Sequence, residues 1–146
     1  MAKQNKTDIK EQPRVQIVID ASGFILGRLA SYAAKQSMLG KKVIIVNCDK
    51  ALVTGRRRMV ISEYLSARTR GGRSLNGPHF PKHSDRLVKR TVKGMLSYTQ
   101  QRGLDALKRV ICHNGVPKEY ESSKKINSQR EIKTKTITLG ELSSEL

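Results

Sequence analysis

The chain has 146 residues, enough for about one domain with a hydrophobic core, and its 29 Lys and Arg outweigh 12 Asp and Glu to give a formal net charge of +17. This excess opposes a compact state by self-repulsion, and a nucleic-acid backbone is the commonest partner of opposite sign. No apolar run approaches the roughly 20 residues of a spanning helix, and the first residues lack the apolar core of a signal peptide. Without Trp and with two Phe, a basic helix on a membrane surface is also disfavoured. We therefore expect a cytoplasmic protein that binds nucleic acid and no membrane.

A strand, a helix and a second strand open the predicted domain. The β-branched run at 15–19 predicts a buried strand, and 43–48 (VIIVNC) predicts another. Residues 24–39 predict a helix, with Ser22 as its cap and Gly40 as its stop. Small residues on this helix are expected to pack closely on a sheet, namely Gly27, Ala30, Ala33 and Ala34. The unit predicts a right-handed parallel crossover and therefore the α/β class.

Shorter elements follow along the chain. They are a strand at 51–54, a helix around 59–67, a helix at 84–98, a short helix at 104–108 and a strand at 109–112. The apolar residues at 59, 60, 64 and 67 predict a buried side of the second helix. Further on, Ile137, Leu139 and Leu142 predict a docking segment or a terminal helical turn.

The helix at 84–98 has two chemically distinct faces. At about 100° per residue, Arg86, Lys89, Arg90 and Lys93 share one narrow face. Apolar residues fill the broad opposite face, namely Leu87, Val88, Val92, Met95 and Leu96. One side is therefore suited to a core and the other to a polyanion.

A basic loop at 69–84 precedes that helix. Its three glycines and two prolines exclude regular structure, and long loops in compact domains are usually functional or disordered. The stretch from Gly55 to Arg109 carries 14 Lys and Arg against 3 Asp and Glu, which is +11 of the total +17. One-signed charge of this kind indicates a contact surface, so the loop is interpreted as an arm for nucleic acid.

Motifs for catalysis or cofactors are weak. Gly23 and Gly27 follow a strand, but bulky residues lie between them where a dinucleotide fingerprint needs glycine. His79 and His83 are four residues apart, yet prolines prevent a helix across them and no third metal ligand is near. Cys48 and Cys112 are expected to be buried thiols rather than a disulfide. We expect no enzyme activity, no metal and no cofactor.

Several segments together resemble one known family. They are DASGFILGRLAS at 20–31, VIIVNCDKALVTG at 43–55, RTRGGRSLNGPHFPKHSDRLVKRTVKGML at 68–96, GLDALKRV at 103–110, NGVP at 114–117 and ITLGEL at 137–142. Taken together they resemble the universal large-subunit ribosomal protein family L-thirteen, in its archaeal and eukaryotic branch. The pattern covers about residues 14–142.

The resemblance implies a three-layer α/β/α fold around a mainly parallel four-stranded sheet, with a basic loop and extended tails. It implies a structural and assembly role in the large ribosomal subunit, through ribosomal RNA and neighbouring ribosomal proteins, without a small-molecule substrate. The expected organisation is a tail at 1–13, an RNA-binding domain at 14–117 and an extension at 118–146. The RNA-binding positions expected from the resemblance and the helix face are Arg56, Arg57, Arg58, Arg68, Arg70, Arg73, His79, Lys82, Arg86, Lys89, Arg90 and Lys93.

Two alternatives stay open at this level. A small nucleotide-binding α/β enzyme would hold its ligand at the strand ends near Asp20 or Asp49. A free DNA-binding protein would use the same positive charge on duplex DNA. Phe80 is also open, since its ring could stack on a base or pack the loop onto its own domain.

Overall fold

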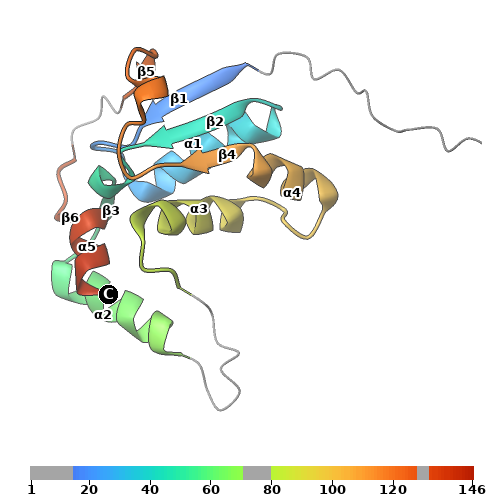
Figure 1. Ribbon diagram of the computed structural model, residues 1–146. Coiled ribbons are helices and arrows are strands. Elements are labelled where there is room, and N and C mark those ends of the chain that lie inside the picture. Colours follow the sequence, from blue (N-terminus) through green and yellow to red (C-terminus); the bar gives the residue numbers. More distant parts are fainter. Residues whose placement is uncertain (1–14, 71–79, 128–131) are drawn as a thin grey trace, which may run out of the picture.

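A four-stranded parallel sheet lies at the centre of the computed structural model, which describes residues 15–70, 80–127 and 132–146 (Figure 1). Its strands are β1 (Gln16–Asp20), β2 (Lys42–Val46), β4 (Val110–Cys112) and β5 (Lys125–Ile126). The order across the sheet is β4-β2-β1-β5, and every pairing is parallel. The inner strands β1 and β2 are β-branched runs, as expected for strands covered on both faces.

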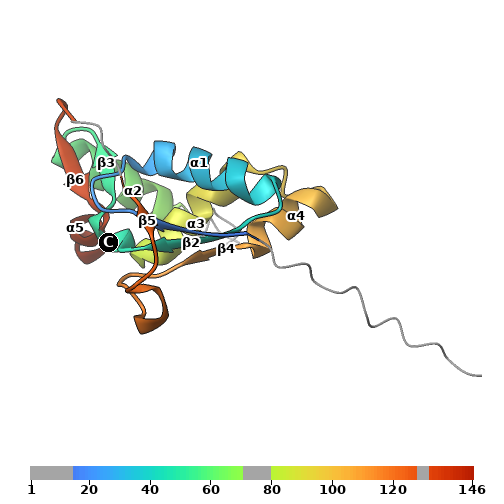
Figure 2. The same ribbon diagram turned by 90° about the horizontal axis from the view of Figure 1, so that it is seen from above.

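Three helices cover one face of this sheet. They are α1 (Leu26–Met38), α3 (Ser84–Met95) and α4 (Gln101–Lys108). Alternate strand residues such as Ile19 and Ile45 point to this side and join the main core. Leu29 of α1 and Val88 of α3 are fully buried in the same core. Figure 2 shows α1 along one side of the edge-on sheet.

The other face is covered by a thinner layer. Val18, Ile44 and Val46 point to it and form a second cluster with Val116 and Tyr120. The covering segment joins β4 to β5 and contains the 3₁₀ helix η2 (Lys118–Tyr120), which lies across the sheet from α1 (Figure 2). The three layers and the α/β class with a parallel four-stranded sheet are therefore confirmed.

A second, smaller unit forms at the carboxyl end of β2. The 3₁₀ helix η1 (Cys48–Lys50) leads into β3 (Leu52–Thr54), which pairs antiparallel with β6 (Thr136–Thr138). Helix α5 (Leu139–Glu145) follows, and α2 (Arg57–Thr69) lies beside it (Figure 1). The three apolar residues predicted to dock are at most 2% exposed, so that prediction is confirmed: Ile137, Leu139 and Leu142.

Several local predictions were wrong. Ser22 does not cap α1, because the helix begins after Ile25 and the Ser22 N–H instead contacts Asp20 Oδ1 at 3.0 Å. Cys48 does not extend β2, since Asn47 turns the chain with a left-handed φ of 55°. Gly27 lies on the exposed side of α1, and an added Cβ there would meet nothing within 4 Å.

Two helices also differ from the sequence pattern. Helix α3 ends at Met95 rather than at 98, because Leu96 is extended and turns into the core. Helix α2 buries only Val60, and Met59 is 68% exposed. The apolar side of α2 is therefore mostly outside the main core.

Candidate nucleic-acid interface

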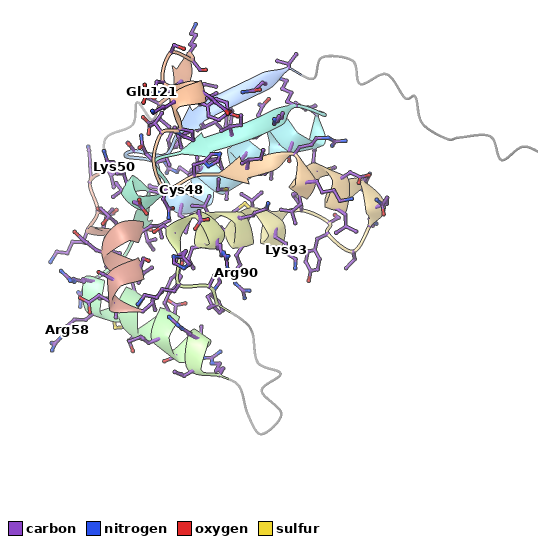
Figure 3. The ribbon with its side chains drawn as sticks, viewed as in Figure 1. Cys48, Lys50, Arg58, Arg90, Lys93 and Glu121 are labelled. Carbon is purple, nitrogen blue, oxygen red and sulfur yellow. The ribbon has the colours of Figure 1, made fainter. Side chains whose placement is uncertain are left out.

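Helix α3 presents a row of cations on the side opposite the sheet. Its core positions Leu87, Val88 and Val92 are at most 2% exposed. The spacing of about 3.6 residues per turn therefore directs the remaining face outward. Its cations are Arg86, Lys89 and Lys93, which are exposed, and Arg90, which is half-buried. Arg90 and Lys93 point away from the sheet in Figure 3.

Aromatic rings hold part of this face in place. The Arg90 guanidinium lies over the Phe80 ring, 3.9 Å from its centroid, and Phe80 meets Tyr64 of α2 edge-on at a centroid distance of 6.0 Å. Burial raises the pKa of Tyr64, with a further contribution from Glu63, so its hydroxyl stays neutral at physiological pH. Lys93 Nζ lies 4.8 Å from the Tyr98 ring centroid. Phe80 thus packs the end of the loop onto its own domain, which was one of the two readings left open.

A pocket opens beside the cationic face. Its volume is about 530 Å³, and it is lined by Phe80, Pro81, Arg86, Lys89, Arg90, Lys93 and Leu107. The four cations are the predicted α3 positions. Pro81 and Leu107 were missed, because nothing in the sequence shows that α4 packs next to the end of the loop.

The arginines of α2 form a separate group. Arg56 precedes the helix and Arg58 projects from the end farthest from Arg90 (Figure 3). Arg57 donates to Glu145 of α5 at 2.9 Å, with both side chains exposed. Arg68 donates to the main-chain carbonyl oxygen of Leu146. Two of these predicted positions therefore have intramolecular partners and do not lie in the α3 row.

The loop positions are only partly described. Arg70 is the exposed residue directly after α2, and Lys82 is exposed two residues before α3. Arg73 and His79 lie outside the described residues. The structure therefore places ten of the twelve predicted positions, and four of the ten form one continuous helix face.

Asp20, which was considered as part of a nucleotide site, has a structural role. Asp20 Oδ1 accepts from Ser22 N–H at 3.0 Å and from Asn47 Nδ2 at 3.1 Å. Burial acts to raise the pKa of Asp20, but these hydrogen bonds and nearby Lys125 outweigh it and hold the pKa below its usual value. The carboxylate thereby ties the end of β1 to the end of β2.

The two cysteines lie together in the core. A hydrogen-bonded contact with Cys112 and burial both raise the pKa of the Cys48 thiol, so it is a poor nucleophile. Both are free thiols; Cys48 is buried, and Cys112 is only partly buried. Across residues 15–70, 80–127 and 132–146, no group of three or more His, Cys, Asp or Glu is placed to hold a metal ion. Over the same ranges, no helix has the length and apolar character needed to cross a bilayer.

The fold and this cationic face define a class of small, strongly basic α/β proteins whose surface chemistry suits a polyanion. Comparison with known proteins narrows this class to one family. The sequence model described as Ribosomal protein L13 matches residues 14–119. The chain belongs to the ribosomal protein L13 family, so the resemblance noted above is confirmed.

Three archaeal relatives share most of their length with the chain, and each is called large ribosomal subunit protein uL13. The protein of Methanosarcina barkeri is 43% identical over 135 residues, covering 88% of this chain and 96% of the relative. That of Archaeoglobus fulgidus is 42% identical over 135 residues, covering 88% and 86%. That of Methanopyrus kandleri is 35% identical over 142 residues, covering 92% and 88%. Membership of this structural family confirms that the protein is not an enzyme and removes the nucleotide-dependent alternative.

Proposed function

We propose that the protein is a structural constituent of the large ribosomal subunit and binds its ribosomal RNA through the outer face of α3. The observation that carries the proposal is the row of Arg86, Lys89, Arg90 and Lys93 on one side of a helix whose other side is core. Among the described residues, Arg86 and Lys89 have no carboxylate partner, so their charge is available to phosphates. The relatives' names, which place those proteins in the large ribosomal subunit, support the choice of partner.

The basic loop at 69–84 extends this contact in our proposal. Arg70 and Lys82 lie at its two described ends, and both are exposed. Arg73 and His79 complete the loop contribution on sequence grounds. Arg56, Arg57, Arg58 and Arg68 form a second, weaker contact, because Arg57 and Arg68 must first exchange their partners on α5. We further infer that the protein acts in the cytoplasm, beside other large-subunit proteins, with residues 14–117 as its RNA-binding body and 118–146 as an extension.

The mechanism is electrostatic and positional. Each Lys or Arg that neutralises a phosphate releases condensed counterions. For duplex DNA, each neutralised phosphate makes the plot of log binding constant against log salt concentration steeper by about 0.9. Arginine adds planar, paired donors that suit phosphate oxygens, while lysine acts as a point charge. The core residues of α3 keep the row straight, so several phosphates can be met at once without ordering the helix on binding.

A charge-reversal variant tests the proposal. Arg86, Lys89 and Lys93 are changed to Glu, while Arg90 is left because it packs on Phe80. We expect a folded protein that no longer enters large subunits, measured by sedimenting cell extracts on sucrose gradients at moderate and high salt. The matched control changes three exposed cations away from this face to Glu, namely Lys35, Lys118 and Lys124, and should still enter. Normal incorporation of the first variant would exclude the α3 face as the RNA contact.

A further inference from the structure

We propose that the pocket between α3, α4 and the end of the basic loop binds one unpaired nucleotide of the RNA, with its base stacked on the Arg90 guanidinium. The proposal rests on the proposed function, and it states which feature of the RNA the outer face of α3 recognises. It adds a site for an extruded base to a surface that otherwise contacts only the sugar–phosphate backbone.

The lining of the pocket has more apolar surface than phosphate binding needs. Phosphates are met by cations alone, and Arg86, Lys89 and Lys93 supply these at the exposed edge. Apart from Arg90, the remaining lining is apolar and comes from Phe80, Pro81 and Leu107, which belong to the loop end and α4. A combination of flat apolar surface and surrounding cations matches a nucleotide, which has a base to bury and a phosphate on each side.

The stacking surface is Arg90. Its guanidinium is held over the Phe80 ring at 3.9 Å, and the Phe80 ring is braced by the Tyr64 ring at 6.0 Å. Guanidinium planes stack on bases as aromatic rings do, and a plane already fixed on an aromatic ring loses little freedom when a base arrives. Tyr64 therefore supports Phe80 from its edge, and the stack that the base would extend consists of Phe80 and Arg90.

The size of the pocket favours a single unpaired nucleotide over a paired RNA helix. A pocket of about 530 Å³ lies within the range of roughly 300–1,000 Å³ that holds a small organic ligand. A paired base cannot enter it, because its edges and faces are occupied inside the duplex. The face should therefore prefer RNA with a bulged or looped-out base to a fully paired helix of equal charge.

The test compares two RNA hairpins that bind the full-length protein. One carries a single bulged 2-aminopurine, and the other is fully paired with the same number of phosphates. We expect the bulged hairpin to bind about tenfold more tightly, the scale of one stacked base, and its fluorescence to change on binding. The salt slopes of the two hairpins should agree, because the phosphate contacts are the same.

A pocket-filling variant separates this site from the rest of the face. Leu107→Trp fills part of the pocket with a larger side chain and does not change the charge. The bulged and paired hairpins should then bind with about equal affinity, and the affinity for the paired hairpin should be unchanged. Leu104→Trp is the control on the same helix, since Leu104 is 39% exposed and is not part of the pocket lining. It should keep the preference.

The outcomes distinguish the two proposals. If the wild-type protein binds both hairpins equally, without a fluorescence change but with a normal salt slope, the nucleotide site is wrong and the phosphate contact stands. A bulge preference that survives in Leu107→Trp also overturns the site. If neither hairpin nor large-subunit RNA binds, the proposed function fails, and the nucleotide site fails with it.

Discussion

Gly103, the third residue of α4, lies directly against the main-chain carbonyl of Ser97 in the turn between α3 and α4. A Cβ at position 103 would overlap that carbonyl carbon and oxygen, which belong to the backbone and cannot move aside as a side chain can. The hydrogen bond from Gly103 N–H to Gln100 O, at 3.0 Å, fixes the same turn. This close approach sets the position of α4 beside α3 and thereby one wall of the cationic pocket.

Gly103→Ala should destabilise the fold. Forcing a methyl group into a filled site commonly costs about 1–3 kcal/mol, and the value here should lie at the upper end because backbone must shift. Gly27→Ala is the matched control in α1, where an added Cβ meets nothing within 4 Å. That change should stabilise the fold by about 0.4–1 kcal/mol, since Ala has less backbone freedom than Gly to lose on folding. Urea denaturation of both variants measures the difference, and equal effects would contradict the packing seen at Gly103.

Asp20→Ala should lower stability in a pH-dependent manner. The native pKa of Asp20 is lowered, so the carboxylate contributes stability that is present above the unfolded pKa of about 3.9 and disappears as the pH falls through the native pKa. At pH 7 the loss of its two hydrogen bonds, from Ser22 and Asn47, should cost about 1–3 kcal/mol. The difference in free energy of unfolding between wild type and variant should decrease as urea titrations are repeated from pH 5 down to pH 2. A gap that does not change over this range would show that the charge of Asp20 is not what the fold uses.

The ion pair between Arg57 and Glu145 should contribute little to stability. Its atoms are 2.9 Å apart, but the two side chains are 60% and 45% exposed, so water and salt screen the attraction. A double-mutant cycle with Arg57→Ala and Glu145→Ala should give a coupling free energy below about 1 kcal/mol, decreasing further in salt. A coupling above about 2 kcal/mol would mean that α2 is held to α5 more firmly than this exposed geometry allows.

Regular periodicity explains which parts of the fold were predictable. The β-branched runs before Asp20 and Asn47 and the amphipathic pattern from Leu26 to Met38 each favour one structure strongly, and all three elements were confirmed. The pairing of β3 with β6 was not predictable, because each strand has three residues and they come from distant parts of the chain. Local geometry also decided details that composition does not encode, such as the left-handed turn at Asn47.

The structure groups the predicted contact residues on one face only where a helix orders them. Arg86, Lys89, Arg90 and Lys93 share a face because helical spacing requires it, whichever elements pack behind them. Arg57 and Arg68 were assigned to RNA binding from the family resemblance, and the structure shows both contacting the end of α5. Whether an arginine is available to a partner depends on tertiary neighbours, which the residue pattern did not include.

The return of β6 and α5 to the core affects how the protein must be made. Leu139 N–H bonds to Ala51 O at 2.9 Å, and Ser84 Oγ donates to Leu139 O at 3.3 Å, so the last core residues close contacts begun much earlier in the chain. During synthesis, Cys48, Ala51 and their neighbours therefore stay incompletely covered until residue 142 has left the ribosome. Contacts between distant parts of the chain slow folding, because their loops must close first. We therefore expect that a nascent chain with this net positive charge exposes apolar core surface next to polyanions until β6 and α5 pack, which favours assembly soon after synthesis.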